Sequence, residues 1–548
     1  MKKHIVHLLA TFLLFLPVAT SSLATGGFAY GTKASRLVKY DTFVIEESDD
    51  TATIKEIYFE NFSYDKLLKL HSDYQNKIIV YPPKCSIELS IPNNPDLQSI
   101  PANRVDFNGT TFHVTNTTKD VCLFVTCQVS KTLTEMLGKN DIDKGDITHN
   151  DSLNKGRILL DIKDARPWAY RNDASDKRHI YRSDILLLEN GKALNAPIAP
   201  YDTPSTEVCG DTKSGGTKYV HEYVRLSDIP AFIKNVTIHR TFKSTKKTLP
   251  FYIHHRDGVT LENINVDRDT TKNNTLYGDR CFYIKACTNV TLRNIEVKNT
   301  FSQSNKYGYA FELDNVYNIK FDNITAYQCK WGVFGCSNVH KAYFNNCKLN
   351  RIDLHCYGRD FECVNCTFLK SDISDYNSTD ITNFYGTLRY RECTFENFQP
   401  HVVDVSYNIY TGCDLIFEDC TFNLGNRSYQ LVSMSGLAGD TPLRPENWQK
   451  CLPNITMRRV RFNYTGPDNF TTFRIFTANN GVKNLGHINH ITLSDVNATK
   501  TCILEFDPES STTTATTELP ISRDISGGNL KEVGKNAARE AGQYHKYF

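Results

Sequence analysis

An eight-residue pattern recurs along the second half of the chain in the order apolar, polar, apolar, polar, polar, apolar, polar, apolar. The first copies occupy residues 259–266, 290–297 and 319–326. Later copies begin at residues 342, 361, 388, 415, 455 and 491, so that successive copies start 19 to 40 residues apart. Alternating apolar positions predict a β-strand with one buried face, and the two adjacent polar positions predict a bend at its centre.

The residue at the predicted bend is Asn or Asp in most copies, as in Asn263, Asn294 and Asn323. These residue types tolerate a left-handed backbone conformation and bond their own backbone. One bent strand cannot bury its apolar side alone, whereas stacked copies can. Spacings of roughly 20 to 30 residues suit three short strands per turn. The sequence therefore predicts an all-β fold, a right-handed parallel β-helix solenoid, with loops of unequal length on one side.

Cysteine occupies the sixth position of four consecutive copies, as Cys347, Cys366, Cys393 and Cys420. The flanking copies carry Ile or Val there, which places this position inside the solenoid. We expect the four thiols to stack as small, inert, buried side chains. The alternative is a disulfide between adjacent turns, which export from the cell would permit. The chain has 17 cysteines, so at least one is unpaired within it.

The N-terminal part carries a second set of signals. Residues 64–71 (YDKLLKLH) predict a short amphipathic helix, residues 77–84 (KIIVYPPK) a strand ending in a Pro-Pro turn, and residues 104–114 (RVDFNGTTFHV) an Asp-x-Asn-Gly turn. This order resembles the opening of pectin-lyase-like β-helix proteins. The resemblance extends over about residues 42–507 and implies a parallel β-helix with a small N-terminal cap that contains the helix.

The pectin-lyase-like superfamily includes polysaccharide lyases, glycoside hydrolases, epimerases, phage spikes and adhesins, so the fold does not give the activity. The acidic-pair signature of polygalacturonase-like hydrolases (Asn-Thr-Asp, Asp-Asp, Gly-His-Gly) is absent. The Asn-Gly-Gly-Glu and Arg-x-His-x-x-Asn pattern of alginate-lyase-like relatives is also absent. The resemblance therefore implies a secreted protein with a polysaccharide partner and assigns no catalytic residue.

The net charge of the chain is too small to attract a charged partner by itself. Lys and Arg number 63 and Asp and Glu 61, for a net charge of +2, so we expect no nucleic acid and no membrane surface as partner.

Residues 1–3 are basic, residues 4–19 are mostly apolar, and residues 22–24 offer a small-residue cleavage site. We expect a cleaved export signal and a secreted or periplasmic protein, because a transmembrane anchor would need about 18 apolar residues.

These features divide the chain into four predicted parts. They are the signal peptide at 1–24, the N-terminal cap and first strands at 25–103, the parallel β-helix at 104–507, and a Thr/Ser-rich linker with a polar tail at 508–548. We expect irregular coils from 104 to about 250, because the regular repeat starts only after them.

The strand that precedes each bent strand can be aligned once the repeat is fixed. These strands are residues 251–255, 282–286, 309–313, 331–335 and 351–355. We place inward Ile253, Ile284, Phe311, Val333 and Leu354. Alternation then predicts two outward columns, one of His254, Lys285, Glu312, Phe334 and His355, and one of Tyr252, Tyr283, Ala310, Gly332 and Asp353.

These columns mix acidic, basic and aromatic groups. The candidate catalytic residues are Lys285, His355, Glu312, Asp353, His254 and Tyr283, and the candidate substrate-binding residues are Arg351, Arg359 and Trp331. In a lyase, a cation neutralises the uronate carboxylate, a base removes the neighbouring proton, and an acid assists the leaving oxygen. The competing interpretation is a solvated surface, in which an ion pair such as Lys285 with Glu312 contributes less than about 1 kcal/mol.

The sequence leaves three functions open. The first is a secreted lyase that cleaves a uronic-acid-containing, acidic polysaccharide by β-elimination. The second is a glycoside hydrolase with Glu312 and Asp353 as its carboxylates, about 10 Å apart if they lie two coils from each other. The third is a non-catalytic glycan-binding protein or adhesin. No metal-ligand spacing and no calcium motif is present, so we expect no cofactor, although the carboxylates would allow calcium.

Overall fold

The computed structural model describes most of the chain between residues 35 and 534. The described segments are 35–134, 137–173, 176–197, 220–241, 243–269, 279–298, 308–328, 334–354, 358–369, 379–381, 384–396, 401–406, 411–425, 429–435, 454–467, 470–478, 491–507, 521–524 and 530–534. The predicted signal peptide lies outside them. Within these segments, no helix combines the length and the apolar character needed to cross a membrane.

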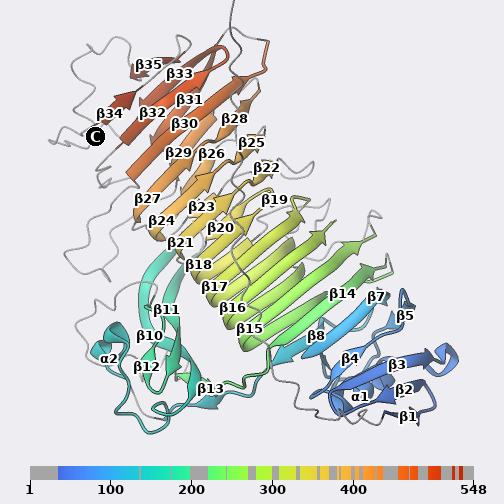
Figure 1. Cartoon of the computed structure of the whole chain (residues 1–548). Coiled ribbons are helices and arrows are strands. Elements are labelled where there is room, and N and C mark those ends of the chain that lie inside the picture. Colours follow the sequence, from blue (N-terminus) through green and yellow to red (C-terminus); the bar gives the residue numbers. More distant parts are fainter. Residues whose placement is uncertain are drawn as a thin grey trace, which may run out of the picture.

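The predicted all-β parallel solenoid is confirmed (Figure 1). Its most regular coils are β15 (Thr248–Arg268), β16 (Asp279–Val297) and β17 (Gly308–Ala326), which pair in parallel along most of their length. Each of these long strands runs around two corners, and residues with positive φ mark them. In β15 these residues are His255, Gly258 and Asn263.

Shorter strands continue the parallel stack toward the C-terminus. They are β18 (Phe334–Asn345), β19 (Lys348–Leu349), β20 (Ile352–Leu354), β21 (Gly358–Val364), β22 (Thr367–Leu369), β23 (Thr379–Ile381), β24 (Phe384–Arg391), β25 (Thr394–Glu396), β26 (His401–Ser406), β27 (Thr411–Glu418), β28 (Thr421–Leu424), β29 (Tyr429–Ser435), β30 (Asn454–Tyr464), β31 (Phe470–Ala478), β32 (Ile491–Ala498), β33 (Thr501–Asp507), β34 (Ile521–Asp524) and β35 (Leu530–Gly534). The last two extend the stack beyond residue 507 by pairing with β32 and β33.

The predicted bend forms a ladder of asparagines. Asn263, Asn294 and Asn323 have φ values of 55°, 52° and 55°. The side-chain amide of each donates to the side-chain oxygen of the equivalent Asn one coil earlier, at 2.8 to 2.9 Å. The ladder starts at Asp106, which accepts a hydrogen bond from Asn235 at 2.8 Å. These bonds satisfy polar groups at a corner where the strand ladder is interrupted.

Aromatic rings stack through the interior of the regular coils. Phe251, Phe282 and Phe311 are fully buried, and successive ring centroids lie 5.1 and 4.8 Å apart. In the later coils the predicted cysteine column continues the interior column of Ile264, Ile295 and Ile324. Cys347, Cys366, Cys393 and Cys420 are buried, and all four are free thiols. Burial raises the pKa of Cys347, which keeps the thiol inert. The predicted free ladder is therefore confirmed.

The N-terminal cap contains the predicted helix. An antiparallel meander of β1 (Arg36–Lys39), β2 (Phe43–Glu47) and β3 (Thr51–Ile57) leads through the 3-10 turn η1 (Phe59–Asn61) to α1 (Tyr64–Asp73). Ser63 Oγ accepts a hydrogen bond from the Lys66 backbone N–H and so begins α1. The helix buries Leu67 and Leu70 against the solenoid core. The first coils follow, from β4 (Ile78–Val80), β5 (Ser86–Ser90), β6 (Ile100–Pro101), β7 (Arg104–Thr115) and β8 (Val121–Cys127).

A separate antiparallel sheet interrupts the solenoid between β8 and β14 (Ala231–Arg240). We call it the inserted sheet. It consists of β9 (Lys131–Thr132), β10 (Arg157–Asp173), β11 (Asp176–Glu189), β12 (Lys192–Ala193) and β13 (Glu222–Arg225), with α2 (Lys139–Lys144) beside them. Its own core includes Leu137, Ile158, Leu160 and Leu186. The sequence predicted only irregular coils here, because an antiparallel sheet does not carry the solenoid repeat.

The inserted sheet packs against the corner of the coils that follow it (Figure 1). An apolar patch of Leu159, Ile185, Leu187 and Val224 surrounds Ala286 in β16. Polar contacts complete the interface. Asn315 Nδ2 donates to Asp161 Oδ1 at 2.8 Å, and Arg157 pairs with Asp257 at 2.7 Å. The sheet therefore docks on the corner that each coil turns after its first straight segment.

Candidate active site

The first straight segments of β15, β16 and β17, with β18, β20, β23 and β26 stacked beyond them, form what we call the second-strand face. One column of positions on this face runs through Tyr252, Tyr283, Glu312, Gly335, Asp353, Asp380 and Asp404. The column beside it runs through His254, Lys285, Asp314 and Ser337. The predicted adjacency of His254 with Lys285 is confirmed, as is the place of Asp353 in the tyrosine column.

The register corrects the predicted place of Glu312. Glu312 pairs with Tyr283, and Asp314 pairs with Lys285. The prediction that Lys285 neighbours Glu312 was wrong, and Asp314 takes that place. Glu312 and Asp353 nevertheless lie two coils apart with Gly335 between them, as the hydrolase hypothesis assumed.

The errors arose in the alignment of two strands. Leu313, and not Phe311, lies beside Ile284, while Phe311 pairs with Phe282. Phe334, which we predicted to face outward, pairs with the buried Phe311. In the strand at 309–313 the shift is two residues, which keeps every side chain on its side of the sheet, so the alternating pattern does not reveal it. In the strand at 331–335 the shift is one residue, which exchanges the predicted inward and outward positions.

Asp314 stands at the centre of a polar cluster. Its Oδ2 lies 3.3 Å from Lys285 Nζ and accepts a hydrogen bond of 3.3 Å from the Tyr283 hydroxyl. Burial raises the pKa of Asp314 above its ordinary value, and the Lys285 ammonium offsets only part of this shift. The side chain still exposes 26% of its surface. A carboxyl group whose pKa is raised by burial is suited to act as a general acid.

Glu312 lies in a different electrostatic setting, although it is two residues away on the same face. Its carboxylate pairs with the guanidinium of Arg280. The same guanidinium lies over the Tyr283 ring, 5.3 Å from the ring centroid. A charge-assisted contact of this kind stabilises the negative charge on Glu312. The two neighbouring carboxyl groups therefore lie in different electrostatic surroundings.

Aromatic rings flank the carboxyl groups. Tyr252 and Tyr283 stack with centroids 5.1 Å apart and planes at 10°, and His254 stacks on Tyr252 at 5.3 Å. Burial lowers the pKa of His254 to about 4, so the ring is neutral at neutral pH. Burial also raises the pKa of Tyr283. This end of the face is a neutral aromatic surface beside the acidic positions.

The other predicted site residues lie away from the two columns or outside the described residues. Arg351 is 3% exposed and so is not available as a surface cation. Arg359 pairs with Asp360 at 3.3 Å and donates to the Pro197 carbonyl oxygen at 3.4 Å. Its place in β21 is beyond the corner. Trp331 and His355 lie outside the described residues, and only the backbone of Asp353 is described, so their roles stay predictions.

A groove of about 620 Å³ runs along another face of the solenoid. It is lined by Glu296, Thr325, Tyr327, Lys348, Thr367, Leu369 and Glu396. Thr325, Lys348 and Thr367 stack in register on its floor. Glu296 and Glu396 are four coils apart, or about 19 Å, which is too far for a catalytic pair. The groove can bind a ligand but lacks paired carboxyl groups.

One set of possible metal ligands comes together among the described residues, although the sequence predicted none. Asp161, Glu222 and His255 place one ligand atom each within 4.8 Å of the others. They come from β10, β13 and β15, and their separation in the sequence left no spacing signal.

Comparison with known proteins finds distant structural neighbours. No protein-family model and no curated protein matches the chain. Among solved structures, the chain is similar to the tailspike protein gp49 from Pseudomonas phage LKA1, with a TM-score of 0.45 and 11% identity over 85% of this chain and 77% of that one. It is also similar to the Gp54 tailspike of Acinetobacter baumannii bacteriophage AP22, solved with A. baumannii capsular saccharide, with a TM-score of 0.42 and 11% identity over 84% and 76%. Likenesses this distant assign neither activity nor ligand to the chain.

Proposed function

We propose that the protein hydrolyses a polysaccharide bound along the second-strand face, with Glu312 and Asp314 as its carboxyl groups. The observation that carries the proposal is the contrast between these two side chains. Arg280 holds Glu312 as an anion, whereas burial raises the pKa of Asp314. Glycosidases separate the roles of acid and base by environments that differ in this way.

We infer an inverting hydrolase from the spacing of the two backbone positions along the strand. Glu312 and Asp314 are two residues apart on β17 and face the same way, which separates their backbones by about 6.6 Å. Inverting enzymes hold their carboxyl groups about 6.5 to 9.5 Å apart, which leaves room for a water molecule. Asp314 would protonate the leaving oxygen, and Glu312 would activate the water on the opposite side of the sugar ring.

The neighbouring positions fit a sugar chain. Tyr252 and Tyr283 offer a ring surface on which the apolar face of a sugar can lie. Gly335 follows Glu312 in the column, so no side chain separates the substrate from the backbone there. Asp353 and Asp380 come next.

A lyase is the second candidate because Lys285 and Tyr283 lie side by side on the same face. Both residue types can remove the proton next to a uronate carboxylate. In the structure Lys285 is engaged by Asp314 at 3.3 Å, and burial raises the pKa of Tyr283. Both conditions make these groups poorer bases than elimination requires, which places the lyase second.

The test is to incubate the purified protein with neutral and acidic polysaccharides and to measure reducing ends and near-ultraviolet absorbance together. A hydrolase releases reducing ends without absorbance, whereas a lyase forms an absorbing unsaturated product. Glu312→Gln and Asp314→Asn should each lower the rate by about 10²- to 10⁴-fold. Glu262→Gln is the matched control, because Glu262 also pairs with an arginine, Arg293, at 3.5 Å.

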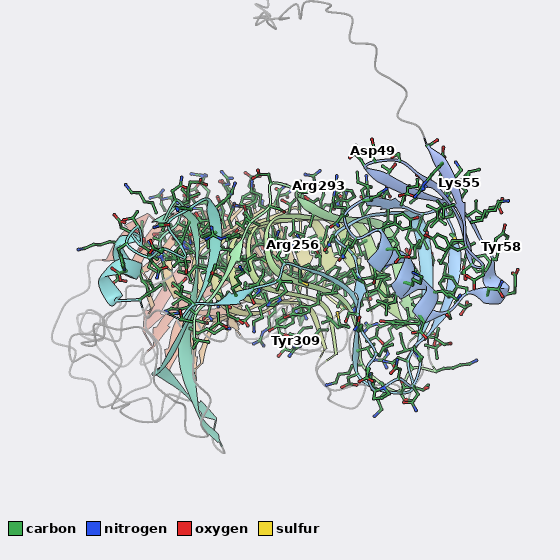
Figure 2. The ribbon with its side chains drawn as sticks, turned by 90° about the horizontal axis from the view of Figure 1, so that it is seen from below. Asp49, Lys55, Tyr58, Arg256, Arg293 and Tyr309 are labelled. Atoms are coloured by element: carbon green, nitrogen blue, oxygen red, sulfur yellow. The ribbon has the colours of Figure 1, made fainter. Side chains whose placement is uncertain are left out.

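The control residue lies away from the proposed site. Figure 2 shows Arg293 on one side of the solenoid and Tyr309 on the opposite side. Tyr309 lies in the part of β17 that contributes to the second-strand face. An equal loss in Glu262→Gln would therefore show a general effect of charge removal and not a catalytic role. Absorbance that disappears in Lys285→Ala would support the lyase instead. Binding without any product would identify a glycan-binding protein. The predicted export signal would place either activity outside the cell.

A further inference from the structure

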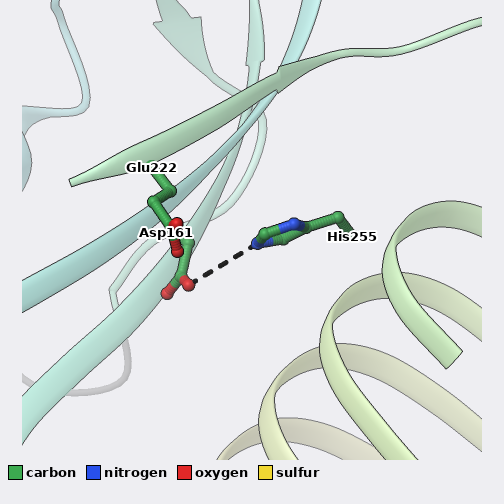
Figure 3. A group of neighbouring side chains, drawn as sticks. All are labelled: Asp161, Glu222 and His255. Atoms are coloured by element: carbon green, nitrogen blue, oxygen red, sulfur yellow. Dashed lines mark ion pairs between the residues drawn. The ribbon is translucent and has the colours of Figure 1, made fainter. Parts of the chain in front are cut away.

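The inserted sheet and the solenoid meet at a buried polar cluster. Asp161 in β10 is 1% exposed and His255 at the corner of β15 is 2% exposed. Glu222 in β13 pairs with Asp161 in register and keeps part of its side chain exposed. Figure 3 shows the two carboxylates and the imidazole pointing toward one another across the interface. Buried ionisable groups normally have hydrogen-bond partners or hold a metal ion.

The imidazole of His255 lacks such partners. Neither of its ring nitrogens has a hydrogen-bond partner among the described residues, and the same holds for Asp161 Oδ2. The separation between His255 Nε2 and Asp161 Oδ2 is 3.7 Å, which is too long for a hydrogen bond. Two ligands that each lie 2.0–2.2 Å from one tetrahedral zinc ion are about 3.3 to 3.6 Å apart. The spacing thus resembles that of two ligands to one ion.

The groups around this cluster leave it with a net negative charge. Lys163 pairs with Glu222, and its Nζ lies 3.5 Å from Asp161 Oδ2. Asn315 Nδ2 donates to the other oxygen of Asp161 at 2.8 Å. Carboxylates that bind metal ions are usually oriented by a hydrogen bond of this kind. His254 stacks on His255 at 3.8 Å. The carboxylates of Asp161 and Glu222 carry two negative charges and the Lys163 ammonium carries one positive charge. One negative charge is therefore left, which a second cation can neutralise.

We propose that Asp161, Glu222 and His255 bind a divalent transition-metal ion that fixes the inserted sheet to the solenoid. An imidazole ligand favours ions such as Zn²⁺ and disfavours Ca²⁺ and Mg²⁺, which prefer all-oxygen sites. Lys163 competes with the ion for both carboxylates. The ion therefore binds more tightly when the lysine charge is removed, which distinguishes this site from a simple ion-pair network.

The experiment uses the full chain, treated with a chelator and dialysed. Zn²⁺ affinity is measured by competition with a chromogenic chelator, and the melting temperature is recorded with and without Zn²⁺ or Ca²⁺. Zn²⁺ should raise the melting temperature and Ca²⁺ should not, because only an ion that binds the folded state stabilises it. His255→Gln and Glu222→Gln should each weaken Zn²⁺ binding by roughly 10-fold or more, and Lys163→Met should strengthen it.

His239→Gln is the matched control. His239 also contacts two carboxylates, Asp267 at 2.6 Å and Asp269 at 3.2 Å, so both of its ring nitrogens are already engaged. This variant should bind Zn²⁺ like the parent. Because Glu222 is partly exposed, Glu222→Gln remains informative even where His255→Gln fails to fold. Equal Zn²⁺ binding in the parent and both ligand variants would overturn the proposal. So would Zn²⁺ binding that appears only in Lys163→Met, since Lys163 would then be the resident cation.

Discussion

Acidification from pH 7 to pH 5 should destabilise the N-terminal cap through His71. The imidazole is fully buried on the inner side of α1, to which His71 belongs. Its Nδ1 lies 2.7 Å from the Pro101 carbonyl oxygen, and its Nε2 lies 2.7 Å from the Tyr81 hydroxyl. A carbonyl oxygen only accepts, so Nδ1 carries the proton and Nε2 accepts from Tyr81. The neutral ring is satisfied, whereas a second proton would break the bond from Tyr81 and bury a charge.

The size of the effect follows from the pKa of this ring. Burial lowers the pKa of His71 to about 4, compared with about 6.5 in an unfolded chain. Between these values the unfolded chain binds more protons than the folded one, so the free energy of unfolding decreases as the pH falls. The loss from His71 is about 2 kcal/mol at pH 5 and approaches about 3.4 kcal/mol below pH 4. Above pH 6.5 the full stability is present.

Urea unfolding followed by circular dichroism at pH 7, 6 and 5 measures this loss. His71→Gln should be less stable than the parent at pH 7, because it disrupts two buried hydrogen bonds. It also lacks the titrating group, so the difference between parent and variant should shrink by about 2 kcal/mol from pH 7 to pH 5. Hydrogen exchange of α1 peptides would show whether the loss is local to the cap. A difference that stays constant with pH would refute the buried neutral ring.

Two further predictions concern the exposed asparagine ladder and the buried cysteine column of the solenoid. Asn294→Ala should lower the free energy of unfolding by about 0.5 to 1.5 kcal/mol, since exposed Asn294 donates to Asn263 at 2.9 Å and accepts from Asn323 at 2.8 Å. Asn294→Gly tolerates the positive φ, so an equal loss in both variants would assign the effect to the hydrogen bonds. A thiol reagent followed by peptide mass spectrometry should label exposed Cys127 in the folded protein, and buried Cys366 and Cys393 only after denaturation. Rapid labelling of the buried pair would contradict their burial.

The solenoid could be predicted because one residue type returns at one place in each coil. Asn263 and Asn294 recur where the backbone must adopt a left-handed conformation, so the bend and the ladder followed together from the pattern. The cysteine column was predictable for a similar reason, because Cys366 and Cys393 occupy a position that Ile or Val fills in other coils. These recurring positions are local in the sequence and repeated in each coil, so they can be recognised without a structure.

Neighbour relations on the second-strand face were harder to predict. The strand at 309–314 contains apolar residues at both Phe311 and Leu313, both face inward, and the sequence alone allows either to lie beside Ile284. Period-two alternation fixes the side of the sheet but not the position along the strand. The choice decides whether Glu312 or Asp314 lies beside Lys285. A correct fold could therefore still yield an incorrect pairing of acid and base, and only the register resolved it.

The inserted sheet and the candidate active site are coupled electrostatically. Asp161 in the inserted sheet contributes to the raised pKa of Asp314, after the larger effect of burial. The residue next to Asp314, Asn315, donates to Asp161 across 154 positions of sequence. The protonation of the proposed acid thus depends on a charge that no pattern in its own strand could reveal. A metal ion bound at Asp161 would neutralise part of the charge that raises the pKa of Asp314. Metal binding should therefore both strengthen the docking of the inserted sheet and lower the pKa of Asp314.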